Sequence, residues 1–168
     1  MNTGLLLLRL LPAALLTGHA TQKLFGWFRG AGPAGSGALF ETWGFRPGRT
    51  LAIIAGCCEL TGAASAALGL LTPAGCAVVV GTMTVAAAPT AGKGLWAHLG
   101  GCEVPVLYAL LAAILAVTGP GRFSLDHALG MTTLNGPAWG AAAVALGLAA
   151  AVPMLLRRRA ALRTDAAS

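Results

Sequence analysis

The sequence predicts an all-α polytopic membrane protein, built as a bundle of transmembrane helices. Apolar residues make up 57% of the 168 residues, and charged residues make up only 10%. Water-soluble domains contain about 45–50% apolar and about 25% charged residues. Eleven basic and five acidic side chains are too few to cover a soluble particle of this length. An ordinary soluble domain is therefore excluded.

Five apolar segments have about the length that a helix needs to cross a bilayer, which is about 20 mostly apolar residues. They comprise residues 5–21, 50–71, 73–91, 101–118 and 137–156. Pro73 and Pro137 stand in the first turn of their segments, where a helix tolerates proline. Because almost no loop separates the second segment from the third, we expect these two to form a tight antiparallel hairpin.

The chain divides into three predicted parts. Residues 1–130 form a four-helix membrane domain, residues 131–156 add a further transmembrane helix, and residues 157–168 form a basic tail. The first apolar segment could alternatively be a cleaved signal peptide, because its apolar run is short. No basic residue precedes that run and Arg9 interrupts it, so we expect a retained helix.

Basic residues set the predicted orientation, because cytoplasmic loops of membrane proteins are enriched in Lys and Arg. With the N-terminus outside, nine of the eleven basic residues lie on the cytoplasmic side. These nine are Lys23, Arg29, Arg46, Arg49, Lys93, Arg157, Arg158, Arg159 and Arg163. We therefore expect a cytoplasmic C-terminus. The basic residues adjoin apolar segments and form no single stripe, so the net charge of +6 does not indicate a nucleic-acid partner.

The loop at residues 22–49 contains six of the ten aromatic residues, mixed with four basic residues. Aromatic rings and arginines together favour the lipid headgroup layer. We expect residues 23–29 to lie along the membrane surface and the Gly-rich residues 30–37 to form a turn. The loop is either a simple interfacial anchor or a lid or lipid-binding element.

Three charged residues, Arg9, Glu59 and Glu103, fall within apolar segments. An unpaired charge there costs at least about 2.5–3.5 kcal/mol, so each needs a partner or serves a pathway. The helical neighbours of Glu59 are Gly and Ala, which allow another helix to approach closely. We predict that Glu59 pairs with Arg9.

A second polar layer is predicted where the first segment ends and the fourth begins. His19 and Lys23 are four residues apart and share a helix face. We expect Glu103 to meet one of them, with His98 close by. The predicted intramembrane polar cluster comprises Arg9, His19, Lys23, Glu59, His98 and Glu103. Such a cluster either fixes which helices meet or forms a proton relay or a quinone headgroup site.

The four cysteines have neither C-x-x-C nor zinc-ligand spacing, so we expect no metal site. They are Cys57, Cys58, Cys76 and Cys102. Buried thiols pack as small apolar residues, and Cys102, beside Glu103, is the candidate redox thiol. No haem, iron–sulfur or nucleotide-binding motif is evident. The sequence therefore indicates no catalytic residue and no evident cofactor, although a quinone fits the polar cluster.

Six short segments occur in a characteristic order, at residues 7–10, 18–25, 56–62, 68–73, 100–103 and 118–126. The last contains a closing motif formed by Gly119, Pro120, Gly121, Arg122 and Asp126. The order and spacing of these segments resemble the pattern of the DoxX family of small bacterial membrane proteins over about residues 5–130.

The resemblance implies a four-helix unit in the bacterial plasma (inner) membrane. It matches Arg9, Lys23, Glu59 and Glu103 to recurrent charged positions of the family. Some relatives are associated with thiosulfate:quinone oxidoreductase, and others with membrane complexes for thiol and oxidative-stress defence. The chain departs from this pattern by adding a fifth helix and a basic tail.

Three functions are considered. The first is a non-enzymatic membrane subunit or scaffold that supports a membrane or peripheral redox or oxidative-stress partner. The alternative is a quinone-interacting subunit of a membrane oxidoreductase. A small-solute or proton transporter fits less well, because no two parts of the chain resemble inverted repeats.

Overall fold

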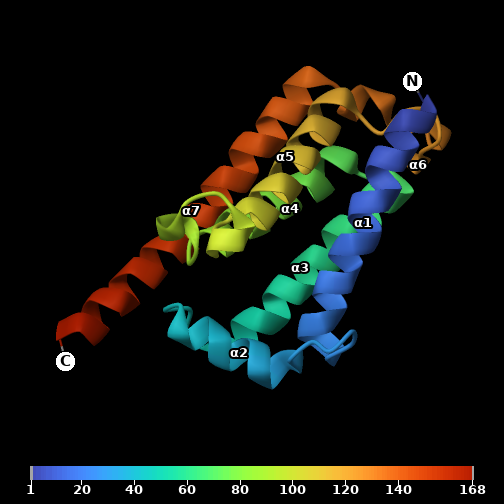
Figure 1. Cartoon of the computed structure of the whole chain (residues 1–168). Helices are drawn as coiled ribbons and strands as arrows, with labels where there is room; N and C mark the ends of the chain where they lie inside the picture. The colour runs from blue at the N-terminus through green and yellow to red at the C-terminus, as the bar shows by residue number, and fades with distance from the viewer. Residues whose placement is uncertain (1, 168) are drawn as a thin grey trace.

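A computed structural model describes residues 2–167 of the chain, and this part contains helices and loops without strands (Figure 1). The α-helices are α1 (Asn2–Phe25), α2 (Gly32–Thr42), α3 (Gly48–Leu68), α4 (Thr72–Ala87), α5 (Glu103–Thr118), α6 (Leu125–Ala128) and α7 (Pro137–Ala167). Short 3₁₀ turns occur at Ala91–Lys93, Ala97–Leu99 and Met131–Leu134. The predicted all-α membrane bundle is confirmed.

The five predicted spans correspond to α1, α3, α4, α5 and α7. By length and composition, α1, α3 and α7 could each cross a membrane. Helices α4 and α5 have 16 residues each, or about 24 Å at 1.5 Å per residue. That is shorter than a hydrocarbon core of about 30 Å. The third predicted span was too long at its end, because α4 ends at Ala87 and residues 88–102 form a loop.

The helices form two groups that diverge toward one end of the molecule (Figure 1). In one group α1 packs on α3, and α2 crosses beneath them; in the other, α4 packs on both α5 and α7. The α3–α4 hairpin joins the groups. Its connection comprises only the three residues 69–71, with Gly69 and Leu71 in the left-handed conformation, so the predicted tight hairpin is confirmed.

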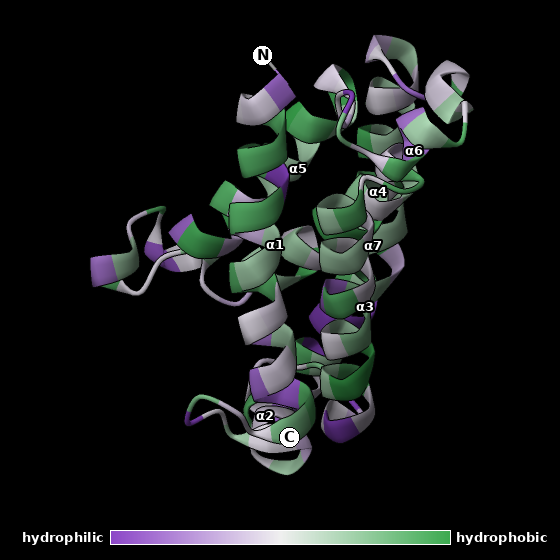
Figure 2. Cartoon of the chain, turned by 90° about the vertical axis from the view of Figure 1, so that its right-hand side faces the viewer, coloured by the Kyte–Doolittle hydropathy of each residue, from purple (hydrophilic) through white to green (hydrophobic). Residues whose placement is uncertain are grey.

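Large apolar side chains lie on the outside of the bundle, and small ones lie inside it. Leu11 and Leu15 of α1 and Leu146 of α7 are 63–65% exposed. The buried core is rich in alanine, for example Ala63 and Ala116. The green of hydrophobic residues accordingly predominates along the helices in Figure 2. Close packing of small residues is typical of helices in lipid, where apolar side chains gain little by leaving the lipid.

Helix α7 is an integral part of the bundle. A Cβ atom added at Gly147 would lie 2.6 Å from the carbonyl oxygen of Ala77 in α4. One added at Gly140 would lie 2.5 Å from the carbonyl oxygen of Ala116 in α5. The helix also continues without interruption past the apolar run, so the arginine-rich residues 157–167 are helical and continue α7.

Two expectations for the loop at residues 22–49 were wrong. Lys23 belongs to the last turn of α1, so the predicted surface segment 23–29 begins inside a helix. The Gly-rich residues 30–37 do not form a simple turn, because α2 begins at Gly32 with Pro33 in its first turn. Proline fixes a backbone angle that suits the start of a helix, and this outweighs the preference of the glycines for a turn.

Candidate functional site

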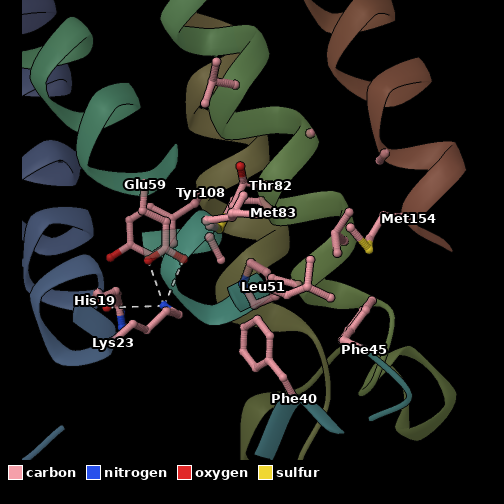
Figure 3. Close-up of a pocket in the computed structure, with 18 of the residues that line it drawn as sticks. His19, Lys23, Phe40, Phe45, Leu51, Glu59, Thr82, Met83, Tyr108 and Met154 are labelled. Carbon is pink, nitrogen blue, oxygen red and sulfur yellow. Dashed lines mark hydrogen bonds and ion pairs between the residues drawn. The ribbon is translucent and has the colours of Figure 1, made fainter. Parts of the chain in front are cut away.

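A cavity of about 500 Å³ lies between the two helix groups (Figure 3). All five long helices contribute to its wall, together with the end of α2 and the loop that follows α2. Ligand-binding cavities in proteins typically have about 300–1,000 Å³. The cavity is therefore large enough for a small organic ligand or part of a lipid.

One side of the cavity carries a buried ion pair between Lys23 and Glu59. The ammonium nitrogen of Lys23 lies 2.7 Å and 2.9 Å from the two carboxylate oxygens of Glu59. It also donates to the carbonyl oxygen of His19 at 3.3 Å. Glu59 is only 3% exposed, so its charge depends on Lys23 as a partner.

Small residues on α3 make this ion pair possible. A Cβ atom added at Gly56, one turn from Glu59, would lie 2.7 Å from the side chain of Leu24 in α1. The two helices therefore approach closely at the level of the ion pair. The sequence correctly predicted that the Gly and Ala face of Glu59 meets another helix.

Tyr108 and His19 adjoin the ion pair on the cavity wall. Their rings make an edge-to-face contact, with centroids 5.8 Å apart and planes at 87°. Tyr108 is 9% exposed. Within residues 2–167, neither the Tyr108 hydroxyl nor the His19 imidazole forms a hydrogen bond with another protein group. Both groups can therefore bond to a molecule in the cavity.

The remaining wall of the cavity is mainly apolar and aromatic. Phe40 and Phe45 lie at one end with ring centroids 5.9 Å apart, and Met83 and Met154 extend from α4 and α7 (Figure 3). Methionine side chains adapt to ligands of different shape. The cavity thus combines one polar edge with an apolar volume, which suits an amphipathic ligand.

Arg9 does not join this site, and the predicted Arg9–Glu59 pair was wrong. The Arg9 guanidinium is 2% exposed and donates four hydrogen bonds of 2.7–2.9 Å to backbone carbonyl oxygens. The acceptors are Ala66, Ala67, Pro120 and Phe123. The first two belong to the last turn of α3, where carbonyl groups lack helical partners and the helix dipole is negative.

Asp126 of the closing motif stabilises the start of α4. Its carboxylate accepts hydrogen bonds from the backbone N–H of Leu71 at 2.7 Å and of Thr72 at 3.0 Å. It also accepts one from the Thr72 hydroxyl at 2.7 Å. Asp126 is 1% exposed. The closing motif therefore stabilises the α3–α4 hairpin through Asp126, which lies more than 50 residues further along the chain.

Glu103 and His98 lie outside the cavity wall, and the expected contact of Glu103 with His19 or Lys23 was wrong. Glu103 accepts a hydrogen bond from the backbone N–H of Ala97 at 2.8 Å, while Lys23 is paired with Glu59. His98 is exposed in the loop that precedes α5. The Glu103 carboxylate therefore bonds to the loop that immediately precedes α5. This loop is closer to Glu103 in the sequence than α1 is. Of the six residues in the predicted cluster, the structure brings together His19, Lys23 and Glu59.

The four cysteines occupy different environments. Cys76 is buried and Cys57 is exposed on the outer surface of its helix, while Cys58 and Cys102 are intermediate. The Cys102 thiol donates to the carbonyl oxygen of Gly94 at 3.6 Å. A redox role for Cys102 stays a prediction. Within residues 2–167, no three His, Cys, Asp or Glu side chains are grouped closely enough to hold a metal ion.

Sequence reasoning missed Tyr108. It is the only tyrosine in the chain and stands in an apolar segment. A tyrosine there has an apolar ring and one polar atom that needs a partner when buried. That combination was the available signal.

The fold and the cavity define a small polytopic helical membrane protein with a ligand-sized cavity between its helices. The family model for DoxX matches residues 4–99, which is more than half of the chain. The chain belongs to the DoxX family. The match includes Arg9, His19, Lys23 and Glu59 and ends before Tyr108, the closing motif and α7. No curated protein and no solved structure matches the chain.

Proposed function

We propose that this DoxX-family membrane protein is a quinone-interacting subunit of a membrane oxidoreductase. The observation that carries the proposal is a large apolar cavity edged by two polar groups, the Tyr108 hydroxyl and the His19 imidazole, that form no hydrogen bond within residues 2–167. A quinone has the complementary chemistry, because its ring carbonyls accept hydrogen bonds and its isoprenoid tail is apolar. Few polar groups at the edge of an apolar cavity are typical of such sites.

Each polar residue of the cavity has a proposed role. Tyr108 and His19 donate hydrogen bonds that orient the ring. Glu59 and His19 can each pass on a proton. The two-electron reduction of a quinone to a quinol takes up two protons. Lys23 keeps the Glu59 carboxylate in place through both of its oxygens. The electrons come from a partner redox protein.

Binding of a short-tailed quinone to the purified chain tests this proposal. Trp43 lines the cavity, so quenching of tryptophan fluorescence by ubiquinone and menaquinone analogues reports binding. Tyr108→Phe removes only the hydroxyl and should weaken binding about fivefold, the effect of a hydrogen bond of about 1 kcal/mol. Thr118→Val is the matched control, because it removes a hydroxyl from the same helix outside the cavity wall. Equal effects of the two variants, or no binding by the wild type, contradict the proposal.

A second candidate is a non-enzymatic scaffold that supports a redox or oxidative-stress partner. The observation that favours it is the helical extension of α7, on which Arg157, Arg159 and Arg163 are exposed. A rigid basic helix at the membrane surface suits an acidic partner. Purification in mild detergent separates the candidates: a stoichiometric redox partner without bound quinone supports the scaffold, and bound quinone in the isolated chain supports the first proposal.

Both candidates include the orientation with a cytoplasmic C-terminus in the bacterial inner membrane. The excess of arginine after the apolar run of α7 supports this orientation. A reporter fused after Ser168 should be active in the cytoplasm. Activity confined to the periplasm would reverse the topology.

A further inference from the structure

A second cavity of about 330 Å³ lies between the arginine-rich part of α7 and the loop that joins α2 to α3. Arg46 of the loop and Arg157 and Arg158 of α7 line it. Phe45 and Met154 also line it, and both residues line the larger cavity as well. The smaller cavity is thus basic on one side and apolar on the other.

We propose that this arginine cavity binds the headgroup of an anionic phospholipid. The phosphate would contact the arginines, and the acyl chains would lie along Phe45 and Met154. The proposal does not depend on quinone binding, because the arginines take no part in the polar edge formed by Lys23, Glu59 and Tyr108.

The charges around the cavity leave it positive after internal pairing. Arg46 forms two hydrogen bonds with the Asp165 carboxylate, at 2.9 Å and 3.0 Å. Arg158 donates to the carbonyl oxygen of Trp43 at 2.8 Å and lies 5.7 Å from the centroid of the Phe45 ring. Neither the Trp43 carbonyl group nor the Phe45 ring neutralises the charge of Arg158. Among residues 2–167, the lining of this cavity contains three arginines and no Asp or Glu side chain.

Arg157 is the most available of these arginines. Within residues 2–167 it forms no hydrogen bond or ion pair, and it is exposed at the cavity. Its guanidinium group has several donors in a planar arrangement that matches phosphate oxygens. It can bind a phosphate without breaking a hydrogen bond or ion pair among the described residues.

The sequence of α7 places the cavity at the expected depth of lipid phosphates. The apolar run of α7 ends at Leu156 and the arginines follow at once, so their side chains reach the headgroup layer. Trp43 and Phe45 adjoin the cavity, as expected for aromatic residues at this depth. Basic pockets between transmembrane helices bind anionic lipid headgroups in other membrane proteins.

Thermal unfolding in neutral detergent tests the proposal without the field of a charged bilayer. Dihexanoyl phosphatidylglycerol should raise the unfolding temperature of the full chain, and dihexanoyl phosphatidylcholine should raise it less. Arg157→Gln should increase the half-saturating phosphatidylglycerol concentration about fivefold, the effect of losing one arginine near anionic lipid. Arg159→Gln is the matched control, because Arg159 is on the same helix but does not line the cavity. It should change that concentration less than twofold.

Three outcomes overturn the proposal. Equal weakening by both variants indicates diffuse attraction to α7, and equal effects of the two lipids indicate no headgroup selectivity. Equal stabilisation by inorganic phosphate indicates a free anion as the ligand. Native mass spectrometry of retained lipid gives a second readout that does not depend on unfolding, and loss of retained phosphatidylglycerol only in Arg157→Gln supports the site. A failure of quinone binding changes none of these readouts.

Discussion

Arg9 and Asp126 stabilise the two sides of the same hairpin, although 117 positions separate them in the chain. Arg9 donates to the last carbonyl groups of α3, and Asp126 accepts from the first N–H groups of α4. Each charge is thereby placed at the helix end whose dipole it complements. The pair holds together three distant parts of the chain at one end of the bundle.

Arg9→Leu should lower the free energy of unfolding by at least about 3 kcal/mol, because hydrogen bonds to a charged group contribute about 1.5–3 kcal/mol each. The variant removes the guanidinium donor from four backbone carbonyl oxygens, of which, within residues 2–167, only that of Ala66 keeps another donor, the N–H of Gly69. Equilibrium unfolding in mixed detergent measures the loss. Arg122→Gln, at an exposed position nearby, should change the free energy by less than about 0.5 kcal/mol. Similar losses in both variants would refute a special role for Arg9.

Asp126→Asn should cost about 1–2 kcal/mol of stability, in the range measured for loss of a helix N-cap. The amide is nearly the same size but offers one acceptor oxygen in place of two. The control is Asp165→Asn, which weakens the exposed ion pair with Arg46, an interaction of at most about 1 kcal/mol. Hydrogen exchange at the amide of Thr72 adds a local readout. Unchanged protection there would contradict the capping role.

Removing Lys23 and removing Glu59 from their ion pair should lower the stability by different amounts. Lys23→Met leaves a carboxylate that is 3% exposed without a partner and should cost about 3–5 kcal/mol. Glu59→Gln should cost less, because the Lys23 side chain is 22% exposed and can reach water. The double variant should be more stable than Lys23→Met alone. Strictly additive losses would mean that the two groups are not energetically coupled.

The same Glu59→Gln variant separates a structural role from a functional one. Loss of quinone binding in a protein that stays folded, with no more than the small loss of stability expected above, supports function at the cavity. Loss of the folded protein supports a role in helix packing. Because the amide preserves the shape of the side chain, a change in cavity volume does not complicate the comparison.

Gly147→Ala should destabilise the protein by about 1–3 kcal/mol through overpacking. The added methyl group would meet the backbone of α4, which cannot move aside as a flexible side chain can. Gly18→Ala is the control, since an added Cβ there has no neighbour within 4 Å. That variant should match or exceed wild-type stability, because alanine favours a helix over glycine by about 1 kcal/mol. Equal behaviour of the two variants would contradict close α4–α7 packing.

The sequence predicted the helices better than their contacts. Hydropathy located α1, α3 and α7 well, because the requirement to hide backbone polar groups from lipid leaves few alternatives. The proline at the start of α4 correctly indicated where that helix begins. The Gly and Ala residues around Glu59 correctly indicated a face of α3 that packs on another helix. The short helices α2 and α6 were not predicted, since their sequences are rich in Gly or very short and depend on tertiary contacts.

The charge pairings failed for a physical reason. The predicted partner of Arg9 was Glu59, the nearest charged side chain of opposite sign expected in the bundle. The actual partners of Arg9 are carbonyl groups, which every residue carries, and the sequence does not reveal which of them lack partners. Ala66 lies seven residues beyond Glu59 on α3, or about 10 Å along the helix axis. The offset between α1 and α3 is set by α2 and its loops, whose conformation was itself mispredicted.

Helix α7 supplies one wall of the larger cavity through Ala150, Ala151 and Met154, and its extension holds the loop at Trp43. It also leaves the ribosome after the other helices that line this cavity. Until it docks, the other helices present an open groove to the surrounding lipid. A hydrophobic ligand can therefore be enclosed during biosynthesis, and its later exchange depends on how readily α7 separates from α4 and α5.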